Sequence, residues 1–148
     1  MKVKFLVLPA IVAAVCFIGQ TVSAKAQAAP VCKLSTLNSS YGAQSTGTLV
    51  SLPAPFTPGI FGFVGLVVFD GKGGLKGEQT FSLNGTIISG TFVGTYKVEP
   101  NCTASFNFTD NSNFSSTLTG VIVNNSQKVL IIQTVPTGTV ITGSFEKL

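Results

Sequence analysis

Residues 73–99, GGLKGEQTFSLNGTIISGTFVGTYKVE, decide the fold of this chain. On both sides of the central Asn84-Gly85 pair, apolar or small residues alternate with polar or charged ones. A period of two is typical of β-strands, because successive side chains point to opposite faces of a sheet. Asn and Gly both tolerate positive φ, which the two-residue turn of a hairpin requires. The stretch therefore predicts two long antiparallel strands, 74–83 and 86–99.

The same alternation extends along most of the remaining chain, and turn formers such as DNSN and VPTG interrupt it. Eight strands are predicted, over residues 41–51, 59–70, 74–83, 86–99, 102–109, 114–124, 127–134 and 138–147. Because most links are short, strands adjacent in sequence should pair antiparallel. This all-β pattern favours a small up-and-down barrel, whose closure leaves no exposed sheet edge. A two-sheet β-sandwich is the alternative.

Glycine and phenylalanine bear on how such a barrel is filled. Glycines on the inward faces favour a barrel, since strongly coiled strands need kinks where the interior is crowded. They are Gly65, Gly77, Gly90, Gly94, Gly120 and Gly143. Most Phe residues after position 28 also fall at inward positions, and they predict a filled interior or a shallow cup. The proline-rich stretch 51–59, SLPAPFTPG, is either a lid over one mouth or a plain connector.

The first 28 residues have the pattern of a secretory signal peptide. Lys2 and Lys4 precede an apolar run over residues 5–18, and small residues offer cleavage after Ala24, Ala26 or Ala28. The run is shorter than the roughly 20 residues that a spanning helix needs. We therefore expect a cleaved signal peptide, 1–28, and a single β-barrel domain, 29–148, with no membrane span in the mature chain. The protein should be secreted, either to a periplasm or to the extracellular space.

The charge of the mature domain excludes nucleic acid as a partner. The whole chain has a formal net charge of +4, with 9 basic residues, all of them lysine, and 5 acidic ones. Three of these lysines lie in the signal peptide, so six lysines and five acidic residues leave the mature domain at +1. A nucleic-acid surface needs a strongly basic face, in most cases with arginine.

Cysteine usage fits an oxidising compartment. Cys16 lies within the signal peptide, which leaves Cys32 and Cys102 as the one pair in the mature domain. An even number of cysteines in a secreted protein predicts a disulfide. A bond between Cys32 and Cys102 would tie the N-terminal segment to the rim of the barrel.

The glycine-rich stretch 69–77, FDGKGGLKG, is the segment that most resembles a ligand loop. A phosphate loop would need a helix after its glycines, and the next residues alternate as a strand does. A calcium loop would need several oxygen ligands, and Asp70 is the one carboxylate in this stretch. We interpret it as a turn between strands 59–70 and 74–83, and we predict neither a metal site nor a cofactor.

Composition also limits catalysis. Without His or Arg, the chain cannot form a histidine-based triad or an arginine clamp on phosphate. Carboxylate chemistry remains, from Asp70, Glu78, Glu99, Asp110 or Glu146. Glu78 and Glu99 are expected to be solvated. No catalytic residue is assigned, and an enzyme is the less favoured interpretation.

The strand predicted over 59–70 is apolar on both faces. Its inward set is Phe61, Phe63, Val67 and Phe69, and its outward set is Ile60, Val64, Leu66 and Val68. An outward apolar row needs a cover, and we predict that a second subunit provides it. The N-terminal segment is the alternative cover. A third option, an outer-membrane barrel, would need aromatic girdles, whereas the chain has 2 Tyr and no Trp.

Three stretches resemble an uncharacterised family of exported bacterial proteins: CKLSTLNSSYG at 32–42, VVFDGKGGLKGEQTFSLNGT at 67–86 and GTYKVEPNCTASF at 94–106. That family has a signal peptide, an F-D-G-x-G hairpin and a G-T-Y-x-V…C core; here Ala104 stands where Gly is common. The resemblance covers nearly all of the mature chain, and its motifs belong to turns and strands. It implies a barrel similar to lipocalin-like or allene oxide cyclase-like folds and supplies no catalytic residue.

Three functions are compatible with this pattern. The favoured one is a secreted, non-enzymatic barrel that binds a small apolar ligand at its mouth. The second is a structural or interaction protein of the cell envelope that assembles through the outward face at 60–68. The third is a cyclase- or isomerase-like enzyme. An open cup lined by Phe would favour the first without a buried carboxylate and the third with one, and a filled barrel would favour the second.

Overall fold

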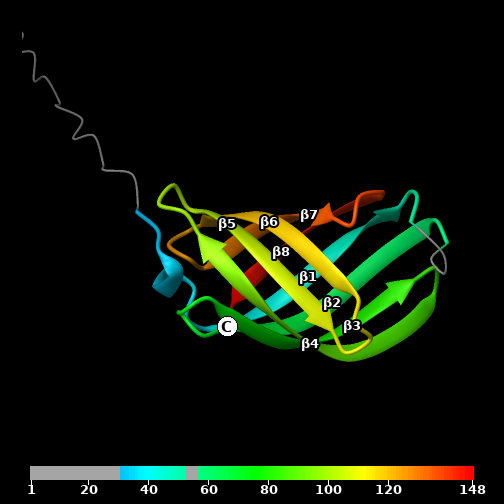
Figure 1. The fold of residues 1–148 in the computed structure, drawn as a ribbon, viewed down its shortest axis with the longest axis horizontal. Coiled ribbons are helices and arrows are strands. Elements are labelled where there is room, and N and C mark those ends of the chain that lie inside the picture. The colour runs from blue at the N-terminus through cyan, green and yellow to red at the C-terminus, as the bar shows by residue number, and fades with distance from the viewer. Residues whose placement is uncertain (1–30, 53–56) are drawn as a thin grey trace, which may run out of the picture.

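The structure is a computed structural model that describes residues 31–52 and 57–148, and its strands form one closed barrel (Figure 1). The strands are β1 (Ser40–Leu49), β2 (Gly59–Phe69), β3 (Gly74–Leu83), β4 (Thr86–Val98), β5 (Thr103–Asp110), β6 (Ser115–Val123), β7 (Lys128–Val135) and β8 (Thr139–Lys147). Each pairs with the next along the chain, and β1 also pairs antiparallel with β8. This last ladder closes the barrel, which confirms the predicted fold and excludes the sandwich.

Strand boundaries follow the alternation of the sequence closely. The largest difference is at the end of β1, which was expected to reach residue 51 and ends at Leu49. Asn84 and Gly85 have φ values of 50° and 87°, so the β3–β4 turn uses the positive φ that predicted it. The predicted signal peptide lies outside the described residues.

The two ends of the barrel differ. One end, here called the closed end, carries the N-terminal segment 31–39 and the C-terminus (Figure 1). The other end, here called the mouth, carries the β3–β4, β5–β6 and β7–β8 connections. The N-terminal segment contains a short 3-10 helix, η1 (Leu34–Thr36), which the sequence pattern did not predict. In the part of the chain that the structure describes, no helix is long and apolar enough to cross a membrane.

Aromatic rings fill the barrel near the closed end. Phe69 of β2 is 1% exposed and lies at the centre of this cluster. Its ring centroid lies 5.3 Å from that of Tyr41, 5.1 Å from Tyr96, 5.7 Å from Phe106 and 5.9 Å from Phe145. The contacts with the two tyrosines are edge-to-face, a geometry that stabilises aromatic pairs beyond the burial of their area. This half of the barrel is a packed core.

The N-terminal segment covers the closed end. The Tyr96 hydroxyl donates to the carbonyl oxygen of Leu37 at 2.8 Å and lies 3.1 Å from that of Leu34. Leu37 is fully buried. On the other side of the core, the Tyr41 hydroxyl donates to the carbonyl of Ser126 at 2.8 Å. Burial raises the pKa of both tyrosine hydroxyls, so they remain protonated donors at neutral pH.

Inward glycines allow close approach at two positions in this half. A Cβ added to Gly94 would collide with the carbonyl oxygen of Asn107 on β5. A Cβ added to Gly77 would collide with the carbonyl oxygen of Leu66 and with the ring of Phe92. The prediction that inward glycines mark crowded positions is confirmed at both.

Candidate functional site

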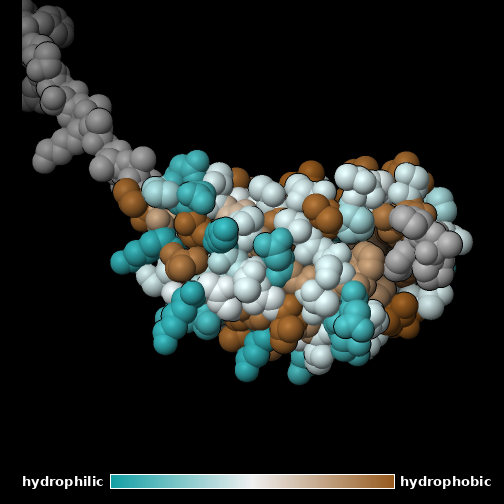
Figure 2. Space-filling model, in the orientation of Figure 1, coloured by the Kyte–Doolittle hydropathy of each residue, from teal (hydrophilic) through white to brown (hydrophobic). Residues whose placement is uncertain are grey.

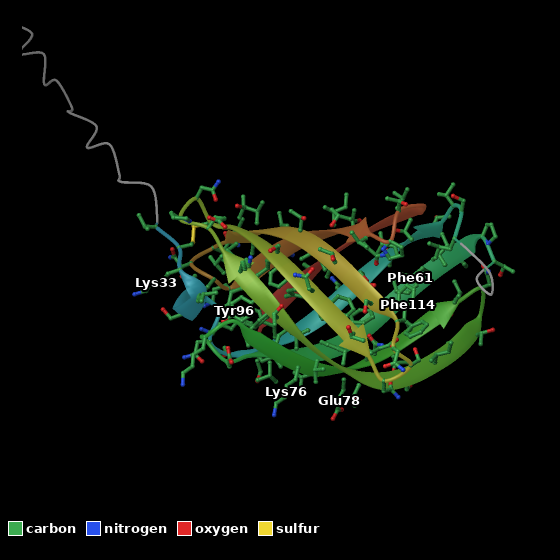
Figure 3. The ribbon with its side chains drawn as sticks, viewed as in Figure 1. Lys33, Phe61, Lys76, Glu78, Tyr96 and Phe114 are labelled. Atoms are coloured by element: carbon green, nitrogen blue, oxygen red, sulfur yellow. A yellow bond between two sulfur atoms is a disulfide. The ribbon has the colours of Figure 1, made fainter. Side chains whose placement is uncertain are left out.

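The mouth of the barrel holds a cavity of about 280 Å³. This volume lies near the lower limit of the ~300–1,000 Å³ typical of small-molecule sites. Five aromatic rings line it, those of Phe61, Phe63, Phe81, Phe108 and Phe114. Figure 3 shows Phe61 and Phe114 at this end and Tyr96 at the other. The Phe side chains are therefore divided between two regions: some fill the closed half of the barrel, and others line an open cup at the mouth.

Three side chains separate the cup from the packed core. Phe63, Phe108 and Leu118 line the cup and also a deeper void of about 30 Å³. The residues around the deeper void are all apolar, so nothing there would orient a ligand. The candidate site therefore ends at this layer of side chains.

Three buried polar side chains line the cup. They are Gln79 of β3 and Ser45 of β1, each 8% exposed, and Ser116 of β6, 5% exposed. Within residues 31–52 and 57–148, none of these three side chains has a hydrogen-bond partner. Gln133 differs, because its amide nitrogen donates to the Thr139 hydroxyl at 3.2 Å. Sequence reasoning missed Gln79 as a site residue, although its position in the inward series with Leu75 and Phe81 was a signal that could have found it.

One carboxylate lines the cup, that of Asp110 at the end of β5. Its Oδ1 accepts hydrogen bonds from the Ser112 amide at 2.8 Å, the Ser112 hydroxyl at 2.6 Å and the Phe114 amide at 3.0 Å. Such bonds from an Asp side chain to the following backbone stabilise a turn. Asp110 therefore shapes the rim of the mouth through the β5–β6 connection.

The Asp70 stretch is a turn, as interpreted from the sequence. Asp70 Oδ1 accepts hydrogen bonds from the amides of Lys72 at 2.7 Å and Gly74 at 2.8 Å. The bond from Lys72, followed by that from Gly74, lowers the pKa of the Asp70 carboxyl. The carboxylate thus serves the β2–β3 connection at the closed end, away from the cup.

The remaining candidate carboxylates also lie outside the cup. Glu146 forms an ion pair with Lys128, with 2.7 Å between Oε1 and Nζ, and this contact lowers the pKa of the Glu146 carboxyl. Glu99 and Glu78 are exposed, and Glu78 points away from the barrel (Figure 3). Among the residues that the structure describes, no group of three His, Cys, Asp or Glu side chains could hold a metal ion.

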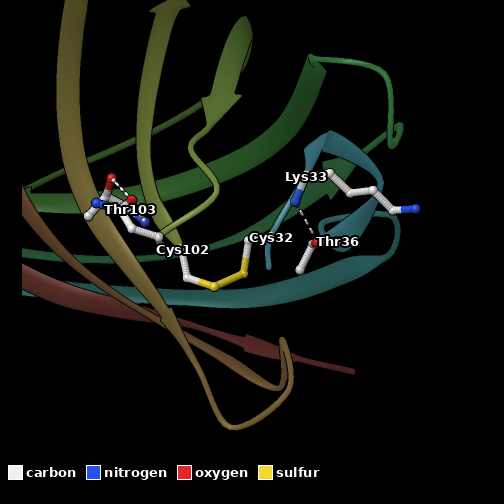
Figure 4. The surroundings of a disulfide bond; sticks show 6 residues. Cys32, Lys33, Thr36, Cys102 and Thr103 are labelled. Carbon is white, nitrogen blue, oxygen red and sulfur yellow. Dashed lines mark hydrogen bonds between the residues drawn. A yellow bond between two sulfur atoms is a disulfide. The ribbon is translucent and has the colours of Figure 1, made fainter. Parts of the chain in front are cut away.

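The predicted disulfide between Cys32 and Cys102 is present (Figure 4). The two Cα atoms lie 4.9 Å apart, within the range of disulfide geometry. The Cys32 amide also donates to the carbonyl of Pro100 at 3.2 Å. Beside Cys102, Asn101 Oδ1 accepts bonds from the Thr103 amide and hydroxyl at 3.1 and 2.8 Å. The disulfide therefore ties the N-terminal segment to a braced β4–β5 turn at the closed end.

The outward row of β2 lies on the outer surface of the barrel. Ile60 is 72% exposed, Val64 61% and Leu66 38%, and Val68 is half-buried. The cross-strand neighbours of the last three are Lys76, Glu78 and Thr80 on β3 and Ser40, Gly42 and Gln44 on β1. The apolar strip is therefore about one residue wide over this length. On the face visible in Figure 2, apolar residues are likewise separated by polar ones.

The proline-rich connection 51–59 borders the mouth. Leu52, near its start, lines the cavity. Pro53, Pro55 and Phe56 lie outside the described residues. The lid hypothesis for this connection stays a prediction.

Comparison with known proteins supports the fold. No family model and no curated protein matches the chain. Among solved structures, a redesigned β barrel is similar, with a TM-score of 0.53 and 16% sequence identity over 80% of this chain and 98% of that one. At this identity the similarity shows the barrel fold alone. The resemblance to a family of exported bacterial proteins stays a prediction.

Proposed function

We propose that this protein is an exported, non-enzymatic β-barrel that binds a small apolar ligand in the cup at its mouth. The observation that carries the proposal is the uneven filling of the barrel. Aromatic side chains pack the closed half, whereas five Phe rings at the mouth surround a cavity of about 280 Å³. Apolar pockets with a few polar groups are the usual form of small-molecule sites.

The chemistry at the rim supports binding over a cyclase or isomerase activity. An acid–base catalyst in such a cup would need a titratable group directed at the ligand. Asp110 is the carboxylate that lines the cavity, and its Oδ1 accepts three hydrogen bonds from its own turn. That arrangement is typical of a structural residue.

The first prediction tests occupancy of the cup with N-phenylnaphthylamine, a neutral dye that fluoresces in apolar surroundings. Wild-type protein should enhance its fluorescence saturably. Ser45→Phe should weaken dye binding roughly tenfold or more, because the new ring takes up cavity volume. The control is Thr46→Phe, which places the same ring on the outer face of the same strand, where Thr46 is exposed. Absence of saturable binding to the wild type would contradict the proposed function.

A second candidate function is assembly through the outward row of β2, in the role of an envelope protein. The exposure of Ile60 and Val64, 72% and 61%, favours it, since water contact with a row of apolar side chains is unfavourable. The polar flanks of the strip oppose it, because a stable interface buries about 1,200–2,000 Å² in total. We therefore place assembly after ligand binding.

The second prediction tests this assembly. If β2 forms a subunit interface, Val64→Lys with Leu66→Lys should convert an oligomer into a folded monomer, because two ammonium groups would have to be buried on association. Sedimentation velocity measures the particle size. Thr119→Lys with Val121→Lys adds the same charge on the outer face of β6 and should leave the size unchanged. A monomeric wild type at micromolar concentration would rule out the interface.

A further inference from the structure

The polar groups of the cup carry information about the ligand. Gln79 lines the cavity and is 8% exposed, yet its side-chain amide has no hydrogen-bond partner within residues 31–52 and 57–148. Buried amides are nearly always hydrogen-bonded, and an exception needs an explanation. The described residues contain no side-chain nitrogen or oxygen that is both sealed from the cavities and unpartnered. The Gln79 amide is therefore unpaired because it faces the open space of the cup.

The strand register keeps this amide accessible. Gln79 lies midway along β3, opposite Gly65 on β2 and Gly90 on β4. Directly paired residues share a face of the sheet, and neither glycine has a side chain of its own; among side chains, the Phe63 ring and the Asn111 side-chain oxygen lie closest to where their Cβ atoms would be. The Ser45 hydroxyl lies midway along β1 and the Ser116 hydroxyl near the start of β6; both line the same cavity, also without partners in the described chain.

The charge of the cup restricts the polar group that could pair with Gln79. The residues that line the cavity include no lysine, and their one charged side chain is the Asp110 carboxylate at the rim. An anionic group in the cup would therefore meet a negative charge and no cation, and burying an unpaired charge is costly. A cationic group would find its one counter-charge in Asp110, whose Oδ1 already accepts three hydrogen bonds from its own turn. The group that fits beside Gln79 is neutral.

We propose that the ligand is an uncharged amphiphile whose apolar body contacts the Phe rings and whose buried hydroxyl or carbonyl pairs with the Gln79 amide. This inference rests on the proposed function. A glutamine amide both donates and accepts hydrogen bonds, so it serves either kind of head group. A ligand without such a group would displace water from Gln79 and leave the amide unpaired, which lowers affinity.

Three ligands with the same ring system test the inference: naphthalene, naphthol and naphthoate. The hydroxyl of the naphthol and the carboxylate of the naphthoate are attached at the same ring position. Equilibrium dialysis gives the affinity of each for the full protein. Wild-type protein should bind naphthol about five- to tenfold more tightly than naphthalene, the value of one hydrogen bond. It should bind naphthoate more weakly than naphthol. Gln79→Leu should remove the preference for naphthol while it retains or increases the affinity for naphthalene. Gln44→Leu, the same change on the exposed outer face of β1, should retain the preference.

The outcomes separate this inference from the proposed function. If naphthalene and naphthol bind the wild type equally and Gln79→Leu changes neither, the cup binds apolar ligands but Gln79 pairs with water, and the inference on the head group is wrong. Tightest binding of naphthoate would also overturn it, because the cup would then accept an anion. If no naphthyl compound and no N-phenylnaphthylamine binds, the proposed function itself fails. Circular dichroism of Gln79→Leu shows whether the barrel remains folded.

Discussion

Replacing Phe69 by alanine is expected to lower the free energy of unfolding by about 3–5 kcal/mol, the usual loss for a buried aromatic residue. Phe69 is 1% exposed, and its ring contacts four others, from β1, β4, β5 and β8. Since these strands surround the barrel axis, no single neighbour can move inward to fill the space without leaving its own contacts. We therefore expect a value in the upper part of this range.

Urea unfolding followed by circular dichroism measures this loss, and Phe61→Ala is the matched control. Phe61 lies on the same strand and on the same face, but it is half-buried at the cup. Its replacement should cost distinctly less stability, while it weakens binding of N-phenylnaphthylamine. Equal losses of stability for the two variants would show that the barrel is not divided into a packed half and an open half.

The barrel could be predicted from the sequence because its decisive features are local. Asn84-Gly85 fixes one hairpin through φ values that few other residues adopt. The period of two on each side then decides which face is inward, and the number of strands with the short links favours a closed barrel over a sandwich. The inward direction of Phe61, Phe63, Val67 and Phe69 and the outward direction of Ile60 and Val64 come from the same rule.

The division into a packed half and a cup could not be predicted in the same way. Alternation assigns a side chain to a face, but it does not say what lies across the barrel from it. Leu37 is fully buried and accepts the Tyr96 hydroxyl bond through its carbonyl, although it precedes β1 and belongs to no period-two pattern. The closed end depends on this contact between residues far apart in sequence.

The polar residues of the cup could be predicted from the sequence only in part. Gln79 was not singled out from the sequence: alternation places it on an inward face, but it does not distinguish a hydrogen-bonded core amide from an open one. Asp110 was visible as a carboxylate, and only the bonds from Ser112 and Phe114 show its role in the turn. The candidate site therefore needed the three-dimensional arrangement, whereas the inward direction of Gln79 did not.

Loss of the Cys32–Cys102 disulfide is expected to destabilise the barrel by about 4 kcal/mol on the chain-entropy model, because the bond joins residues 70 positions apart. The mechanism acts largely on the unfolded chain, whose freedom the bond restricts. In the folded protein, the bond also holds the segment that supplies the Leu37 carbonyl to Tyr96. Cys32→Ser, Cys102→Ser and the double variant should all lose nearly the same stability, since either change alone breaks the bond.

Equal losses of stability in the three variants distinguish a disulfide from two independently buried thiols. For independent thiols, the stability losses of the two single variants would add in the double variant. Urea unfolding of the three variants and the wild type supplies the comparison. Thiol labelling of unfolded, unreduced protein that begins at residue 29 should find no reactive group, and two per chain would contradict the bond. The double variant should still bind N-phenylnaphthylamine under conditions where it is folded, because the disulfide braces the closed end and the cup lies at the mouth. A loss of dye binding in the folded double variant would mean that the closed end also sets the shape of the cup.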